Sequence, residues 1–343
     1  MRAAFRGLFV AVIAVALGAG VFVGPASASL SLFNSFTGNE GVSTDGCGSN
    51  SASCTLQSLI PTGSTIQAAY LYSSTFSTST DPNGVTLSQG ATSITPTFTP
   101  LGANTFLQAW RADVTTFVQS NITLGSTTVW TATEGAKTSA IDGEALVVVF
   151  SNPLRPTQTV FVLDGFSSSS GDSSKVVTNP LPAGFTAEMM IGDGFSFDGP
   201  NPKSPIDTGQ VSTITLNGIN LTTVAGHCDD SQDTGCANGN LFTMGSTNAG
   251  SHDDPFTPFP CDAIGCIGSD HEHYNLGNIL NVGDTTLNLN TINPSHDDNI
   301  FLEVFDISGT AVVNPTVPEP ASLLLLGAGL AGLGIYFRRG RRR

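Results

Sequence analysis

Between residues 65 and 307, short runs of β-branched and aromatic residues are separated by segments rich in Gly, Pro, Asn and Ser. Apolar runs of this length are typical of strands, and the separating residues favour turns. No apolar stretch here is long enough to predict an amphipathic helix. We therefore predict an all-β fold, a jelly-roll-like β-sandwich, with strands at 65–72, 85–87, 127–133, 145–150, 159–163, 185–191, 210–216, 285–289 and 300–307.

The strongest apolar signal comes from residues 145–150 and 159–163, which are apolar at nearly every position. Continuous apolar runs are typical of strands that are covered on both faces. The connection between them contains Pro153 and Pro156, which favour a loop. We predict that these two strands form a hairpin at the centre of a sheet.

Two other segments are less regular. Residues 29–64 contain scattered apolar positions among Gly, Ser, Asn and Thr, which predicts a loop or an edge strand. Residues 110–117 fit either a short helical turn or a strand, and Asp113 followed by Thr115 indicates a hydrogen-bonded corner.

The N-terminus has the pattern of a secretory signal peptide. Arg2 and Arg6 precede an apolar core at 8–23, and small residues then end in an A-x-A cleavage site. This pattern predicts cleavage between Ala28 and Ser29 by signal peptidase, after export through the Sec translocon.

The C-terminus contains a second apolar run, residues 321–337, which carries no charge over 17 positions. As a helix it would be about 26 Å long, close to the thickness of a bilayer core. We predict a single transmembrane helix, which the arginines after it orient with the C-terminus in the cytoplasm. These arginines are Arg338, Arg339, Arg341, Arg342 and Arg343.

Directly before that run, Pro318 and Pro320 prevent the helix from extending upstream and leave Glu319 in an extended segment. The order of Pro-Glu-Pro, glycine-rich apolar helix and arginine cluster resembles the PEP-CTERM sorting signal of Gram-negative bacteria. The resemblance implies cleavage near Pro318, Glu319 and Pro320 by the membrane transpeptidase exosortase. It also implies a transient stage in the inner membrane, then a place at the cell surface or in the extracellular matrix, associated with exopolysaccharide.

The predicted organisation is therefore a signal peptide (1–28), a β-sandwich ectodomain (29–316) and a sorting signal (317–343), and one or two domains are possible in the ectodomain. The whole sequence has 12 basic and 27 acidic residues. The signal peptide contains two of the basic residues, and the sorting signal contains five basic residues and one acidic residue. The ectodomain therefore has 5 basic and 26 acidic residues, a net charge near −21. This charge excludes nucleic acid as a partner, because phosphate backbones require arrays of Lys and Arg.

Six cysteines, an even number in an exported chain, predict disulfides. Fifteen pairings are possible, and proximity in sequence favours three short loops. These pairs are Cys47 with Cys54, Cys228 with Cys236, and Cys261 with Cys266.

All five histidines and many aspartates lie between residues 227 and 296 or directly beside that segment. Carboxylate oxygens suit Ca²⁺, so the acidic residues of these loops are candidate ligands. The alternative is that the loops are simply solvated and ordered by disulfides. The candidates are Asp229, Asp233, Asp253, Asp254, Asp297 and Asp298.

No G-x-S-x-G elbow, H-E-x-x-H helix or phosphate loop is present. Residues 110–165 resemble the ectodomains of adhesin-like bacterial surface proteins. We therefore expect a non-enzymatic protein with a structural or adhesive role. The alternatives are a Ca²⁺-dependent carbohydrate-binding module and a secreted hydrolase, for which Asp193 and Asp198 are the candidate acid and base.

Overall fold

The computed structural model describes residues 30–48, 52–76, 81–104, 106–135, 140–168, 170–194, 212–225, 242–247, 272–293 and 299–313. Strands dominate these residues, and every pair of named strands is antiparallel. The all-β prediction is therefore confirmed. No helix in this part of the chain is both long and apolar enough to cross a membrane.

The strands form four sheets, which we name by their place in the molecule. The first inner sheet has the order β2 (Glu40–Gly48), β10 (Ile141–Ser151), β4 (Thr65–Phe76), β8 (Leu107–Asp113) and β7 (Thr99–Ala103). The first outer sheet has the order β3 (Ser53–Leu59), β9 (Thr127–Thr133), β5 (Thr86–Gln89) and β6 (Thr92–Ile94).

The other two sheets come mostly from the second half of the chain. The second inner sheet has the order β1 (Ser31–Gly38), β11 (Gln158–Asp164), β19 (Asn299–Ser308), β13 (Ala187–Gly194) and β16 (Phe242–Met244), and β17 (His273–Asn275) also pairs with β13. The second outer sheet has the order β15 (Ile219–Ala225), β14 (Ser212–Leu216), β18 (Thr286–Ile292), β12 (Ser173–Thr178) and β20 (Ala311–Val313).

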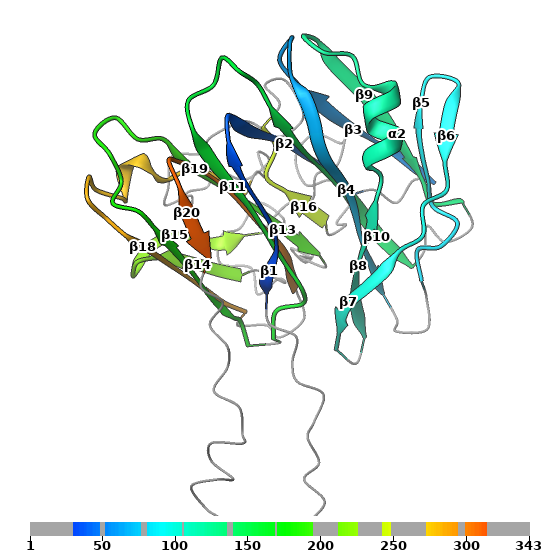
Figure 1. Cartoon of the computed structure of the whole chain (residues 1–343). Coiled ribbons are helices and arrows are strands. Elements are labelled where there is room, and N and C mark those ends of the chain that lie inside the picture. Colours follow the sequence, from blue (N-terminus) through cyan, green and yellow to red (C-terminus); the bar gives the residue numbers. More distant parts are fainter. Residues whose placement is uncertain are drawn as a thin grey trace, which may run out of the picture.

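The four sheets stack as layers, with the outer sheets at the two sides and the inner sheets between them (Figure 1). Three apolar cores fill the spaces between neighbouring layers. The first core contains Trp130 and Leu146, the joint core between the inner sheets contains Val147 and Phe301, and the second core contains Phe305. Alternate residues of β10 and β11 therefore enter different cores, which explains why residues 145–150 and 160–163 are all apolar.

The same strand order occurs twice, in two pairs of facing sheets that we call the first roll and the second roll. In the first roll, the strands β2-β10-β4-β8 of the inner sheet face the strands β3-β9-β5-β6 of the outer sheet. In the second roll, the paths β11-β19-β13-β16 and β12-β18-β14-β15 repeat that order. Each is the two-sheet arrangement of an eight-stranded jelly roll, so the jelly-roll prediction is confirmed in both. β7, β1 and β20 are added at sheet edges.

The predicted hairpin between residues 145–150 and 159–163 is wrong. β10 pairs with β2 and β4 in the first inner sheet, whereas β11 pairs with β1 and β19 in the second inner sheet. The segment between them crosses from one roll to the other. Both strands are buried as predicted, but their partners come from distant parts of the chain.

The N-terminal segment contains strands rather than one loop. β1, β2 and β3 each lie at the edge of a different sheet, so the edge-strand alternative applies to all three. At the corner after β8, the Thr115 backbone N–H donates to Asp113 Oδ1 at 2.9 Å, as the sequence predicts. The corner leads into helix α2 (Thr115–Asn121), and a 3₁₀ turn, η3 (Leu276–Asn278), follows β17.

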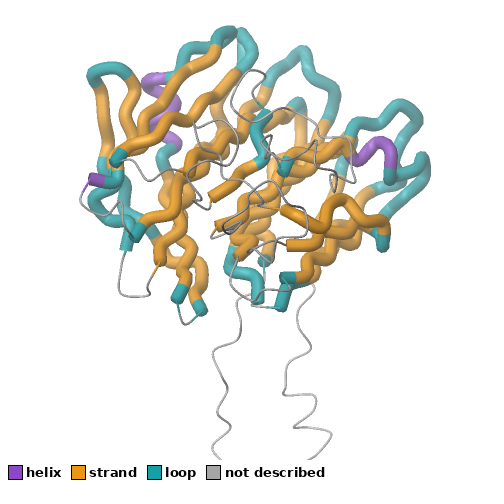
Figure 2. The backbone as a smooth tube through the Cα atoms, turned by 180° about the vertical axis from the view of Figure 1, so that it is seen from behind, coloured by secondary structure: helices purple, strands orange, loops and turns teal. Residues whose placement is uncertain are grey.

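The two chain crossings between the rolls lie at one end of the molecule. One crossing joins β1 to β2 and the other joins β10 to β11. The two contact each other, because the Asn152 backbone N–H donates to Asn39 O at 2.8 Å. Loops close both ends of the layers of strands, which Figure 2 shows from behind.

Candidate functional site

Most site residues predicted from the sequence lie outside the described residues. This applies to Pro318, Glu319 and Pro320, to the five tail arginines, and to Ala28 and Ser29. It also applies to the six aspartates proposed as Ca²⁺ ligands and to four of the cysteines. Their sorting, cleavage, metal-binding and pairing roles stay predictions.

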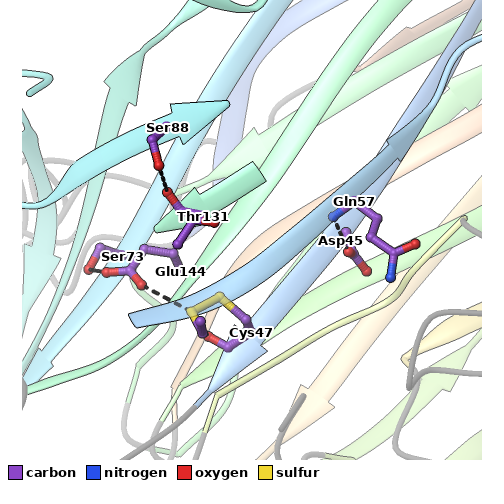
Figure 3. The surroundings of a disulfide bond; sticks show 8 residues. Asp45, Cys47, Gln57, Ser73, Ser88, Thr131 and Glu144 are labelled. Carbon is purple, nitrogen blue, oxygen red and sulfur yellow. Dashed lines mark hydrogen bonds between the residues drawn. A yellow bond between two sulfur atoms is a disulfide. The ribbon is translucent and has the colours of Figure 1, made fainter. Parts of the chain in front are cut away.

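The first predicted disulfide is confirmed. Cys47 at the end of β2 and Cys54 at the start of β3 form a disulfide with an S–S distance of 2.00 Å (Figure 3). It joins the inner and outer sheets of the first roll. Because only seven positions separate the two cysteines, it closes a short loop.

Glu144 on β10 points toward this disulfide (Figure 3). Its Oε2 lies 3.7 Å from Cys54 Sγ, and the Ser73 hydroxyl donates to its Oε1 at 3.4 Å. Burial raises the pKa of Glu144 far above its usual range, and the nearby Asp142 raises it further. Glu144 is therefore a neutral acid at pH 7. Cys47, Cys54 and Glu144 are close enough together to suggest a metal site, but disulfide sulfurs are not the thiolates that bind metals.

Asp193, which the hydrolase alternative required, lies in β13 and is fully buried. Its Oδ1 accepts a hydrogen bond from the Asn299 backbone N–H at 3.1 Å, which ties β13 to the start of β19. This contact indicates a structural role. Asp198 lies outside the described residues.

A cleft of about 710 Å³ opens between the two rolls at the end where the chain crosses. We call it the inter-roll cleft. The first roll contributes an apolar wall that includes Val42, Leu59 and Pro61. The second roll contributes a polar wall, with the side chains of Gln158, Glu188, Asp306 and Ser308. Its volume is typical of small-molecule sites.

The polar wall is built on paired strands. Glu188 on β13 and Asp306 on β19 are direct cross-strand partners, so their side chains lie on the same face. Met190 and Val304 on that face enter the joint core. Nearer the end of the sheet the two rolls separate, and carboxylates replace the apolar residues. The jelly-roll pairing therefore brings together two acids that are far apart in the sequence.

Arg155, from the segment that crosses between the rolls, completes the wall. Its Nη2 donates to Asp306 Oδ2 at 2.9 Å and its Nε donates to Glu40 O at 2.6 Å. The Arg155 side chain is 32% exposed and that of Asp306 10% exposed. Burial raises the pKa of Asp306 to about 7 although Arg155 lowers it, and Glu188 and Glu40 raise it further.

Two acceptors in this wall have no hydrogen-bond partner among the described residues: Asp306 Oδ1 and Gln158 Oε1. Behind Glu188, the buried His273 ring lies with Nε2 3.3 Å from Glu188 Oε2 and Nδ1 2.7 Å from Ser246 O. Because a carbonyl oxygen only accepts, Nδ1 carries the proton of this contact. The wall thus combines acceptors with the exposed donors of one guanidinium.

The sequence patterns did not predict this cleft. Glu188 and Asp306 lie within the predicted strands 185–191 and 300–307, where an acid usually faces solvent. The available signal was the pair of acids, Glu303 and Asp306, within a largely apolar run, which indicates polar groups at buried positions. Nothing in the sequence indicated that Arg155 would reach it.

The fold and the C-terminal segment together define a class: an exported β-sandwich protein with a C-terminal sorting signal. Residues 316–343 match the PEP-CTERM protein-sorting motif, so the C-terminal segment is a PEP-CTERM sorting signal. The resemblance seen in the sequence is therefore confirmed. The signal marks the protein for export and sorting to the cell surface, with exosortase as the processing partner.

No curated protein matches the chain. Among solved structures, the major capsid protein of mavirus aligns over 83% of this chain and 92% of its own, with 10% sequence identity and a TM-score of 0.18. This likeness is too low to support any conclusion about fold or function. The jelly-roll assignment rests on the strand order of this chain alone.

Proposed function

We propose that the protein is a non-enzymatic component of the cell surface or extracellular matrix, with a structural or adhesive role associated with exopolysaccharide. Signal peptidase removes residues 1–28, the helix at 321–337 holds the folded ectodomain in the inner membrane, and exosortase cleaves near Pro318, Glu319 and Pro320. The observation that carries the proposal is the PEP-CTERM signal at residues 316–343.

The described body supports this role. Four stacked sheets with three apolar cores favour a rigid, long-lived body, and a disulfide suits an oxidising compartment outside the cytoplasm. The net charge near −21 favours solubility in the matrix. Asp193, the described residue of the hydrolase alternative, has a structural contact instead.

The test is to follow the protein in cells with active exosortase after changing Pro318, Glu319 and Pro320 together to Ala, Gln and Ala. We expect the variant to accumulate in the inner-membrane fraction with its arginine tail intact. Pro315→Ala, a proline change just outside the motif, is the control and should reach the surface normally. Normal surface delivery of the triple variant would contradict the proposal.

A further inference from the structure

We propose that the inter-roll cleft binds a neutral, hydroxyl-rich glycan segment. The inference deepens the proposed function, on which it rests for its biological setting, because it names a ligand class and a site for the association with exopolysaccharide.

The charges around the cleft select against ionic ligands. Glu188 and Asp306 lie in the polar wall and Glu40 lies near Asp306, and among the described residues only the guanidinium of Arg155 opposes these acids. An anion would meet more like charge than opposite charge. A cation would have to compete with the Arg155 guanidinium, which already lies 2.9 Å from Asp306. A neutral ligand avoids both penalties.

The hydrogen-bonding groups of the wall suit hydroxyls, which both donate and accept. Arg155 is 32% exposed and offers donors, and Glu188, whose side chain is 35% exposed, offers carboxylate acceptors. Asp306 Oδ1 and Gln158 Oε1, also in this wall, are buried, so Glu188 supplies the acceptors that a ligand can reach. Hydrogen bonds to charged groups are stronger than those between neutral groups, so Glu188 and Arg155 are the main anchors.

The opposite wall suits the C–H faces of sugar rings. Val42, Leu59 and Pro61 come from the first roll, and Phe185 and Pro182 border the cleft from the second. Leu59 is 41% exposed, so a ligand in the cleft can contact its side chain. A ligand that is apolar on one face and polar on its edges would cover this wall while bonding to the other. Sugar rings have this character.

The test is calorimetric titration of the exported, processed protein with neutral glucose, mannose and galactose hexasaccharides. A galacturonate hexamer and a glucosamine hexamer supply the acidic and cationic arms. We expect saturable binding of at least one neutral hexasaccharide. Glu188→Ala should weaken it about ten-fold or more, and Arg155→Gln should weaken it in the same direction.

The control is Asp113→Ala, which removes an exposed carboxylate from a separate hollow of about 510 Å³ and should leave binding unchanged. Melting temperatures of all variants separate loss of binding from loss of fold. The inference is overturned if no neutral hexasaccharide binds, if only a charged hexamer binds, or if Asp113→Ala weakens binding and Glu188→Ala does not. None of these outcomes affects surface delivery. The proposed function is therefore tested separately, by the variant of Pro318, Glu319 and Pro320. Hydrolysis of a bound hexasaccharide would instead contradict the non-enzymatic part of that proposal.

Discussion

The two rolls have the same strand order, but the contact between the inner and outer sheets at one equivalent position differs between them. In each roll, the last strand carries one buried glutamate that faces the outer core: Glu144 on β10 and Glu303 on β19. In each roll, the second residue of the first outer-sheet strand, β3 or β12, contacts this glutamate. That residue is Cys54 in the first roll, where it forms the disulfide, and Ser174 in the second roll, whose hydroxyl donates to Glu303 Oε2 at 2.6 Å.

This difference shows that the same topology can be stabilised at this position either by a disulfide or by a hydrogen bond to the buried glutamate. In both rolls a buried acid stays protonated, because desolvation raises its pKa, and a nearby aspartate adds to the effect. The first roll adds a covalent link between its sheets. The second roll depends on packing and on one hydrogen bond at this position.

The largest expected effect comes from the core that the two rolls share. Phe301 is fully buried there, with ring centroids 5.3 Å from Phe242 and 6.0 Å from Tyr72. Phe301→Ala should lower the free energy of unfolding by about 3–5 kcal/mol, because it removes contacts to both rolls. Urea unfolding measures this, and Leu154→Ala, at a position 91% exposed, is the control with an expected change within about 0.5 kcal/mol. A similar small change for both variants would show that the inner sheets do not share a core.

The next effect is a dependence of stability on pH. Burial raises the pKa of Glu303 from 4.5 to about 8, so the folded protein keeps a proton that the unfolded chain loses near pH 4.5. This group's contribution to stability is fully present below pH 4.5. It is lost as pH rises toward 8, at up to about 1.4 kcal/mol per pH unit.

Glu303→Gln mimics the protonated acid and should flatten this part of the pH profile. Melting temperatures between pH 5 and 9 measure the difference, and Glu144→Gln is the matched change in the first roll. If the Glu303→Gln profile runs parallel to that of the unchanged protein, Glu303 is not a neutral buried acid.

The disulfide effect should be smaller and restricted to the first roll. Changing Cys47 and Cys54 together to Ala should lower the free energy of unfolding by about 2–3 kcal/mol, on the chain-entropy model for a short loop. Hydrogen exchange should show faster opening of β2 and β3, with β11 and β12 unchanged. Equal loss of protection in both rolls would contradict the prediction that the disulfide stabilises only the first roll.

The smallest expected effect is that of the hydrogen bond in the second roll. Ser174→Ala removes the donor to Glu303 and should cost about 1–2 kcal/mol, because the acid stays buried with one contact fewer. Thermal unfolding measures it. Ser173→Ala, at the exposed neighbouring position, is the control. If the Ser174→Ala variant is as stable as the control, the hydrogen bond to Glu303 does not stabilise the second roll as the disulfide stabilises the first.

Local patterns in the sequence predicted much of the fold. Each predicted strand range overlaps a strand of the structure, because β-branched runs and turn residues determine local geometry. Before β5, the Asn83 backbone N–H donates to Asp81 Oδ1 at 2.9 Å, a local contact typical of Asp in a turn. The disulfide between Cys47 and Cys54 followed from sequence proximity.

Long-range placement could not be predicted in this way. β2 has small and polar residues, yet nearly all of them are buried, because the layers that cover it come from distant segments. The false hairpin has the same cause, since a short connection does not reveal that the chain changes sheets. The inter-roll cleft depends on pairing between β13 and β19 and on Arg155 reaching across, none of which is encoded locally.

The central claim is that the C-terminal signal delivers a folded double jelly roll to the cell surface. Intact-mass measurement of the surface protein from cells with active exosortase tests it most directly. We expect a mass that corresponds to a chain beginning at Ser29, ending near Pro318–Pro320 and lacking Arg338 to Arg343, with the Cys47–Cys54 disulfide formed. A surface population that retains the full arginine tail would contradict the account.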